Sequence, residues 1–287
     1  MLHHELPSWL QSALHAAQCP EPEVESRWIL EAVGLGRLQL FQRSRDPVST
    51  EVQARLAAIL ARRQQREPLQ YILGEAAFRQ LNLIVTPDVL IPRPETEELV
   101  SLAIDCLQKM PTPHPRVVDI GTGSGAIALA LKQEQPQCEV WASDLSEAAL
   151  AIAQQNGARY QLEIQWRSGD LLTPFLEHDP ALSFDLIVSN PPYIPQDNLP
   201  RLAPEVQGFE PLMALSPGPN ALHCYQRFAQ QAPQILVAGG WLIAELEHDL
   251  AEATAALFHS PAWQSVQLIK DLQGQDRFIQ AQRKALS

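Results

Sequence analysis

The stretch Arg116-Val117-Val118-Asp119-Ile120-Gly121-Thr122-Gly123-Ser124-Gly125 decides the fold class of this chain. Its first half reads as a buried strand, and a helical pattern begins at Ala126, directly after the glycines. Glycine in such a turn lets the backbone bend tightly and come close to a bound ligand. We therefore expect a ligand-contacting loop formed by Gly121, Thr122, Gly123, Ser124 and Gly125.

Strand and helix patterns alternate from this stretch toward the C-terminus. Strands are expected at Glu139–Ser143, Glu163–Arg167, Phe184–Ser189 and Trp241–Leu246, with two more near the end, and helices from Glu147, over 222–236 and from Asp249. Such alternation predicts right-handed crossovers and an α/β fold with a parallel, doubly wound sheet. Ligands of such sheets bind at the carboxyl ends of the strands, so functional residues are sought there.

Two acidic positions at strand ends extend the expected ligand site. Asp144 follows Gly121 by 23 residues, at the end of the second strand, where its carboxylate can accept both hydroxyl protons of a ribose. Asp170 follows the third strand and is expected to face an adenine edge, with Leu171 packing nearby. A dinucleotide would satisfy the same pattern, because Gly121-x-Gly123-x-x-Ala126 with a later acid is also a loose NAD fingerprint. The glycine loop alone does not decide between these ligands.

The loop Asn190-Pro191-Pro192-Tyr193 follows the strand Phe184–Ser189 directly. Its two prolines fix their φ angles and remove two donors, which leaves neighbouring backbone carbonyls rigid and free to accept hydrogens. Asn190 adds a side-chain carbonyl, so that two acceptors can face the two hydrogens of one planar NH2 group, and Tyr193 can lie flat against that group. Holding a weakly nucleophilic nitrogen in line with a sulfonium methyl is the chemistry that this loop offers. We therefore predict methyl transfer to a planar nitrogen.

The N-terminal part of the chain has a different pattern. Apolar residues recur at helical spacing up to about Glu67, as at Val52, Leu56, Ile59 and Leu60, which predicts a small helical domain over residues 1–74. A β-hairpin linker is expected over 75–94, with strands at 78–85 and 89–91 joined by a turn at Thr86-Pro87-Asp88. The catalytic domain then covers 95–287.

Composition narrows the classes of partner and compartment. The formal net charge of −12 disfavours an extended grip on nucleic acid, and the basic run Arg55, Arg62, Arg63 and Arg66 is expected to be a solvated face. The four cysteines form no CxxC pair, which favours reduced thiols in the cytoplasm and no metal site. No stretch reaches about 18 apolar residues, so no membrane span is expected. We also expect a monomer.

The motifs resemble those of a known family. Asp119 to Gly125, Asp144 and the run Phe184 to Tyr193 look like the amino-methyltransferases, and the wider pattern is similar to HemK/PrmC, the protein-(glutamine-N5) methyltransferases of peptide chain release factors. Three further segments carry the resemblance over essentially the whole chain: Leu90 to Glu97, Glu205 to Pro211, and Asp271 to Arg277. Two positions depart from the family pattern, Gly218-Pro219-Asn220-Ala221 and Glu247.

The resemblance implies a fold, a cofactor and a substrate. The fold would be the Rossmann-like class I methyltransferase fold with a seven-stranded, mostly parallel sheet. The cofactor would be S-adenosylmethionine, contacted by Gly121 to Gly125, Asp144, Leu171 and Asn190. The loop from Asn190 to Tyr193 would hold the glutamine of a Gly-Gly-Gln tripeptide in a class 1 peptide chain release factor, which the N-terminal domain would dock.

Three alternatives remain at this point. A nucleic-acid amino-methyltransferase acting on adenine is one, because an exocyclic NH2 is also planar, although the net charge of −12 disfavours it. A non-catalytic module that kept the fold is disfavoured by the intact Asn190-Pro191-Pro192-Tyr193. An NAD oxidoreductase would leave this loop unexplained.

Overall fold

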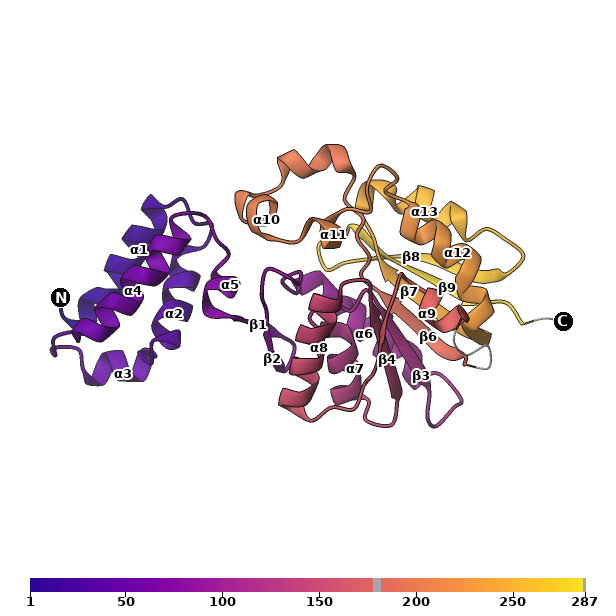
Figure 1. The fold of residues 1–287 in the computed structure, drawn as a ribbon, viewed down its shortest axis with the longest axis horizontal. Helices are drawn as coiled ribbons and strands as arrows, with labels where there is room; N and C mark the ends of the chain where they lie inside the picture. Colours follow the sequence, from indigo (N-terminus) through magenta and orange to yellow (C-terminus); the bar gives the residue numbers. More distant parts are fainter. Residues whose placement is uncertain (178–181, 286–287) are drawn as a thin grey trace. The chain divides into compact units, whose positions relative to one another are not determined.

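The computed structural model describes residues 1–177 and 182–285, and the chain forms two compact units (Figure 1). One unit comprises Met1–Glu75 together with Leu202–Phe209, and the other comprises Ala76–Arg201 and Glu210–Ser287. The sequence predicted a helical region up to residue 74, but nothing in it indicated that Leu202–Phe209 joins that region. The expected catalytic domain of 95–287 includes residues 178–181 and 286–287, which lie outside the described residues.

The first unit is helical. Leu6, Leu10 and Leu14 are fully buried at intervals of four residues, as an amphipathic helix requires, and they share one core with Leu56 and Leu60. The Ser49 side chain accepts a hydrogen bond from the main-chain N–H of Val52 and so caps the helix that begins at Thr50. The elements are η1 (His3–Glu5), α1 (Leu6–Ala16), α2 (Pro22–Ala32), α3 (Arg37–Gln42), α4 (Thr50–Arg63), α5 (Leu69–Leu73) and α10 (Pro204–Phe209).

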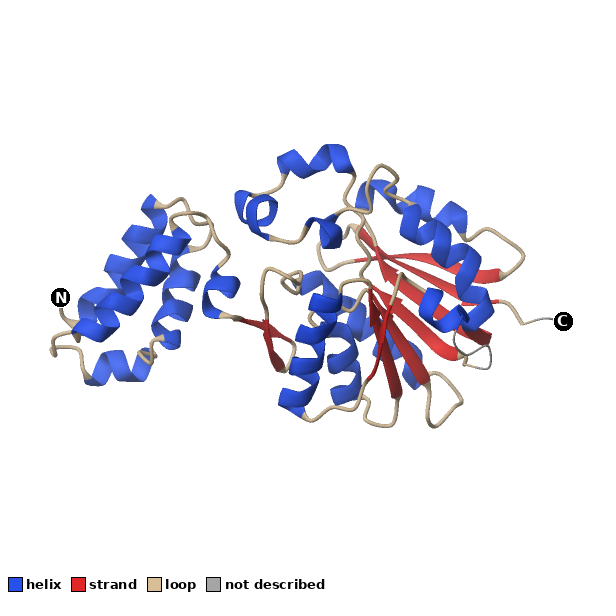
Figure 2. Cartoon of the chain, in the orientation of Figure 1, coloured by secondary structure: helices blue, strands red, loops and turns tan. Residues whose placement is uncertain are grey.

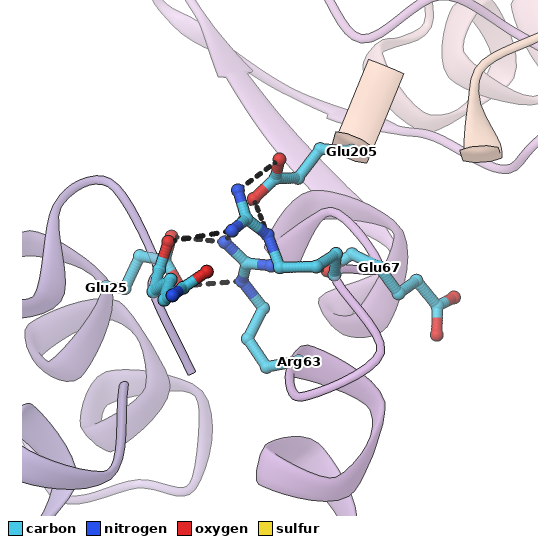
Figure 3. A network of polar contacts seen from close by, with 6 residues as sticks. Glu25, Arg63, Glu67 and Glu205 are labelled. Atoms are coloured by element: carbon cyan, nitrogen blue, oxygen red, sulfur yellow. Dashed lines mark hydrogen bonds and ion pairs between the residues drawn. The ribbon is translucent and has the colours of Figure 1, made fainter. Parts of the chain in front are cut away.

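Arg63 lies in the core of this unit and not on a solvated face as the basic run predicted. Its side chain is 2% exposed and donates two hydrogen bonds of 2.8 Å to the two carboxylate oxygens of Glu25 (Figure 3). It also donates to the main-chain oxygen of Glu67 and to Glu205, whose carboxylate is shared with Arg66. A guanidinium remains charged when buried, so it needs such partners, and here they come from three separated segments.

A short hairpin, β1 (Glu75–Phe78) and β2 (Leu81–Ile84), lies within the expected linker, but its strands differ from those predicted. The chain reverses at Arg79, whose φ is +51°, and residues 89–91 form no strand. Arg79 is anchored there because its main-chain N–H donates to Glu97 and its guanidinium binds Glu134. The expected turn at Thr86–Asp88 exists, closed by a hydrogen bond between these two side chains, but it leads into irregular chain.

The second unit is built on a seven-stranded sheet, which confirms the predicted α/β fold (Figure 2). The strand order is β5-β4-β3-β6-β7-β9-β8, parallel from β5 to β7 and antiparallel at β9 and β8. The strands are β3 (Arg116–Ile120), β4 (Glu139–Asp144), β5 (Gln165–Ser168), β6 (Phe184–Ser189), β7 (Leu236–Glu245), β8 (Trp263–Lys270) and β9 (Asp276–Arg283). β7 begins earlier than predicted, because Gly239, with a φ of +80°, lets it continue through an irregular register.

Helices cover both faces of this sheet. Val117 packs into a core shared with α6 and α7, whereas its neighbour Val118 packs into a core shared with α12 and α13, as alternation along a strand requires. The helices are α6 (Pro94–Gln108), α7 (Ala126–Glu134), α8 (Glu147–Tyr160), α9 (Thr173–Glu177), α11 (Leu212–Leu215), α12 (His223–Ile235) and α13 (Ala251–Leu257), with 3-10 turns η2 (Gln196–Arg201) and η3 (His248–Leu250). In the described part of the chain, no helix has the length and apolar character needed to cross a membrane.

Candidate active site

A cavity of about 430 Å³ opens at the carboxyl ends of β3, β4, β5 and β6. Each of these strands is followed by a loop that contributes to its wall, as expected for a parallel sheet. The lining includes Asp88, Val89, Leu90, Gly121, Gly123, Asp144, Leu145, Ser146, Gly169, Asp170, Leu171, Asn190, Pro192, Pro211, Met213, Ser216, His223 and Cys224. Each of the four loops therefore contributes at least one predicted residue to the same cavity wall.

The glycine loop after β3 is held against the end of β4. The main-chain N–H groups of Gly121 and Thr122 both donate to the carbonyl of Ser143, and Gly123 N–H donates to the carboxylate of Asp144 at 2.8 Å. Gly123 adopts a φ of +55°, which disfavours any residue with a Cβ. Gly125 has a φ of +84°, and a Cβ there would lie 3.2 Å from the Cβ of Ala153. This loop needs glycine for its conformation and for its approach to α8.

Asp144 ends β4 with its carboxylate in the cavity wall. One oxygen accepts from Gly123 N–H and the other from Ser146 N–H, both at 2.8 Å. Burial raises the pKa of this carboxyl, while these main-chain donors act in the opposite direction. The main-chain N–H of Leu145 also acts on this carboxylate, which has about four acceptor positions, so acceptor capacity remains for a ligand hydroxyl.

Asp119, within the quoted motif, is fully buried beneath the glycine loop. One carboxylate oxygen accepts from the Thr122 hydroxyl at 2.6 Å and from Ala128 N–H. The other oxygen finds no hydrogen-bond partner among the described residues. Burial raises the pKa of Asp119 to about 7. No sequence pattern indicated a separate role for Asp119.

The loop after β5 places Asp170 and Leu171 in the cavity wall. The carboxylate of Asp170 also pairs with Arg227 of α12, a contact that the sequence did not indicate. Leu171 adopts a φ of +50°, and its carbonyl accepts from the Ser143 hydroxyl. The contacts that these two residues make with a cofactor stay predictions.

The loop after β6 carries Asn190 and Pro192 into the cavity wall, whereas Pro191 is buried. The Asn190 side-chain NH2 donates to the Thr96 hydroxyl at 3.0 Å. The Tyr193 hydroxyl donates to Glu245 at 2.9 Å, so its ring is anchored beside the cavity and not in its lining. Further along, Ile194 N–H donates to the carbonyl of Leu215. The loop is therefore fixed at both ends.

Two residues that the sequence reasoning missed support this loop. Thr96, near the start of α6, and Glu245, the last residue of β7, are 4% and 1% exposed, and the Thr96 hydroxyl donates to Glu245 at 2.8 Å. Burial raises the pKa of Glu245 to about 7 and also raises that of Tyr193. Thr96 lies in a quoted motif and Glu245 lies within the predicted strand Trp241–Leu246, but neither carried a signal of its contact with the loop.

Several predicted residues support the site from behind its wall. Thr122 and Ser124 are buried. The Thr122 hydroxyl donates to the Asp119 carboxylate, and the main-chain carbonyl of Ser124 accepts from the side-chain NH2 of Asn156. At the two departures from the family pattern the backbone suits the residues present, since the left-handed φ of +92° falls on Gly218. Glu247 has a φ of −74°, which any residue adopts, and in the segment 218–221 Asn220 accepts from Leu222 N–H at the start of α12.

Comparison with known proteins places this architecture in a family. Residues 5–74 match the family described as PrmC N-terminal domain, and residues 101–202 match the methyltransferase small domain. A methyltransferase from Pyrococcus furiosus shares the fold, with a TM-score of 0.51 and 19% identity over 81% of this chain and 99% of that chain. Release factor glutamine methyltransferases from Geobacter sulfurreducens and Deinococcus radiodurans are each 38% identical, over 94% of this chain and 93% and 94% of their own lengths. The chain belongs to the family of release factor glutamine methyltransferases.

Proposed function

We propose that this protein transfers a methyl group from S-adenosylmethionine to the side-chain amide nitrogen of the glutamine in the Gly-Gly-Gln motif of class 1 peptide chain release factors. The observation that carries the proposal is the loop from Asn190 to Tyr193 at the carboxyl end of β6, with Asn190 and Pro192 in the wall of the cavity. The names of the relatives supply the identity of the substrate.

The cavity fits the proposed cofactor. The Asp144 carboxylate lies in the cavity wall with acceptor capacity left, which suits a ribose hydroxyl. The buried free oxygen of Asp119 lies beneath the glycine loop, where a polar ligand group or a bridging water would satisfy it. We assign cofactor contacts to Gly121, Thr122, Gly123, Ser124, Gly125, Asp144, Asp170, Leu171 and Asn190.

S-adenosylmethionine, when bound, supplies a methyl group on a positively charged sulfur. The work of the chain is to hold the glutamine amide, and Asn190 Oδ1 and the rigid carbonyls of the Pro191-Pro192 segment accept its two hydrogens. As the nitrogen–carbon bond forms and the bond from the methyl group to sulfur breaks, the positive charge would pass to the nitrogen, where these carbonyl dipoles stabilise it. The surplus proton leaves the nitrogen afterwards, so no general base is required before transfer. Tyr193, held by Glu245, is assigned to contact the plane of the amide.

The helical unit is the proposed docking module for the release factor. Its match to the PrmC N-terminal domain over residues 5–74 supports this role. All four cysteines are buried and free, which supports a reducing compartment such as the cytoplasm. A monomer without direct nucleic-acid contacts remains our working proposal.

The decisive assay uses the full-length protein with methyl-labelled S-adenosylmethionine and a class 1 release factor. A second copy of the release factor carries alanine in place of the motif glutamine, and total RNA serves as a third acceptor. Label is expected in the intact release factor alone. Equal labelling of both copies, or preferential labelling of RNA, would refute the proposed substrate.

Asp144→Asn is expected to raise the Kd for S-adenosylmethionine by roughly 10- to 100-fold, because a hydrogen bond to a charged group contributes about 1.5–3 kcal/mol. The asparagine NH2 would also face the N–H donor of Gly123 or Ser146. Titration calorimetry measures the change. Asp185→Asn is the matched control, because Asp185 accepts from Arg116 N–H at the opposite end of the sheet. An unaltered Kd in Asp144→Asn would remove Asp144 from the cofactor site.

A further inference from the structure

Glu245 stands beside the acceptor loop because of the sheet register. Ser189 of β6 is paired with Ala244 of β7 in parallel, so the next residues, Asn190 just after β6 and Glu245 at the end of β7, lie side by side. One carboxylate oxygen of Glu245 accepts from Tyr193, and the other accepts from Thr96. A single buried carboxylate therefore contacts both ends of the loop, directly at Tyr193 and through Thr96 at Asn190.

The direction of these hydrogen bonds follows from the chemistry of the groups. A carboxylate has no proton to donate, so the single hydroxyl proton of Thr96 is committed to Glu245. Toward Asn190, Thr96 can then only accept, and Asn190 must present its NH2. Its carbonyl oxygen is left for the substrate, and within the described residues this oxygen makes no hydrogen bond. If the Asn190 side-chain amide were flipped, its NH2 would face the NH2 of the substrate. Both groups are donors, so no hydrogen bond would form between them.

We infer that Glu245 and Thr96 are positioning residues that set the side-chain amide orientation of Asn190 and so determine that the site receives an NH2 group. This inference rests on the proposed function, because it names the support of the same acceptor loop. Both residues are almost fully buried and lie outside the cavity lining, so both act through Asn190 and Tyr193.

The orientation of the Asn190 amide depends on whether Glu245 is ionised. Burial raises its pKa to about 7, while Thr96, Tyr193 and Arg277 favour the charged form and Glu95 opposes it. The Tyr225 hydroxyl donates to the main-chain oxygen of Glu245 and leaves the carboxylate free for the loop. As the pH falls through about 7, Glu245 takes up a proton and can donate a hydrogen bond. The Thr96 hydroxyl then no longer has to donate to Glu245 and can donate to Asn190 instead.

The test compares Thr96→Val, which removes the hydroxyl, with Thr96→Ser, which keeps it. Thr254→Val is the matched control, since Thr254 is fully buried and its hydroxyl has no partner among the described residues. We expect Thr96→Val to lower kcat roughly 10- to 100-fold with the Kd for S-adenosylmethionine unchanged, because misorientation of a positioning group acts on the reacting geometry. Thr96→Ser should retain at least about a third of wild-type kcat. Equal kcat in wild type and Thr96→Val, or equal losses in the valine and serine variants, would overturn the inference.

A second readout needs no substrate. In protein labelled with 15N-asparagine, the side-chain NH2 signal of Asn190, assigned by its loss in Asn190→Ala, reports the contact with Thr96. It should shift in Thr96→Val, stay in place in Thr96→Ser, and titrate near pH 7 in wild type but not in Glu245→Gln. If the position of the Asn190 side-chain NH2 signal changes neither in Thr96→Val nor with pH, the inference is refuted, even if the release factor is methylated. The expected signals without methylation refute only the proposed substrate.

Discussion

Asn190→Ala is expected to lower kcat by roughly 100- to 1,000-fold, the loss found when one preorganised group facing a developing charge is removed. The substitution removes the Oδ1 acceptor from the cavity wall and leaves the Thr96 hydroxyl without its donor. The Kd for S-adenosylmethionine should change little, because Asp144 and the glycine loop provide most of the proposed cofactor contacts. Single-turnover transfer to the release factor and calorimetric titration of the cofactor separate the two effects.

Asn198→Ala provides the matched control for this variant. Asn198 lies in η2, outside the cavity lining, and its side chain makes no hydrogen bond within the described residues. Its kcat should match that of wild type. Wild-type turnover in Asn190→Ala would remove Asn190 from the mechanism, and a parallel loss of cofactor affinity would move its main role to cofactor binding.

The parts of the fold that the sequence predicted well are those with a local signal. β3 and β6 have the predicted bounds, because each is a mostly apolar segment followed at once by a turn signal, Gly121 after β3 and Asn190-Pro191 after β6. The hairpin was misplaced because its reversal depends on Arg79, whose partners Glu97 and Glu134 are 18 and 55 residues away. No pattern of neighbouring residues indicates such an anchor.

The same limit applies to the candidate site. Asp144 and Asn190 were identified because each follows its own strand directly, and the carboxyl ends of parallel strands share one edge. Thr96 and Glu245 are 149 residues apart, and Thr96 and Asn190 are 94 apart. Their contacts depend on the order of β6 and β7 in the sheet and on the packing of α6, which the motifs do not contain. Once that order is known, the register alone brings Glu245 beside Asn190.

Arg63→Met is expected to lower the free energy of unfolding of the helical unit by about 3–5 kcal/mol, the usual cost of removing one partner of a buried ion pair. The cost arises because Glu25, 7% exposed, would keep its charge without a cation, and the main-chain oxygen of Glu67 would lose a donor (Figure 3). Glu205 would keep its pair with Arg66, so this contact should persist. Hydrogen exchange of the amides in α1, α2 and α4 measures the stability of this unit directly.

Two further variants show whether the buried charge is the cause. Arg62→Met, on the same helix, removes a guanidinium that is 47% exposed, and its pair with Glu67 should contribute only about 0–1 kcal/mol. The double variant Glu25→Met with Arg63→Met leaves no unpaired charge in the core, so it should regain most of the lost stability through apolar packing. If Arg63→Met costs no more than Arg62→Met, water reaches Glu25 when the guanidinium is removed. If the double variant is no more stable than Arg63→Met, the loss comes from the packing and the Glu67 contact and not from the isolated carboxylate.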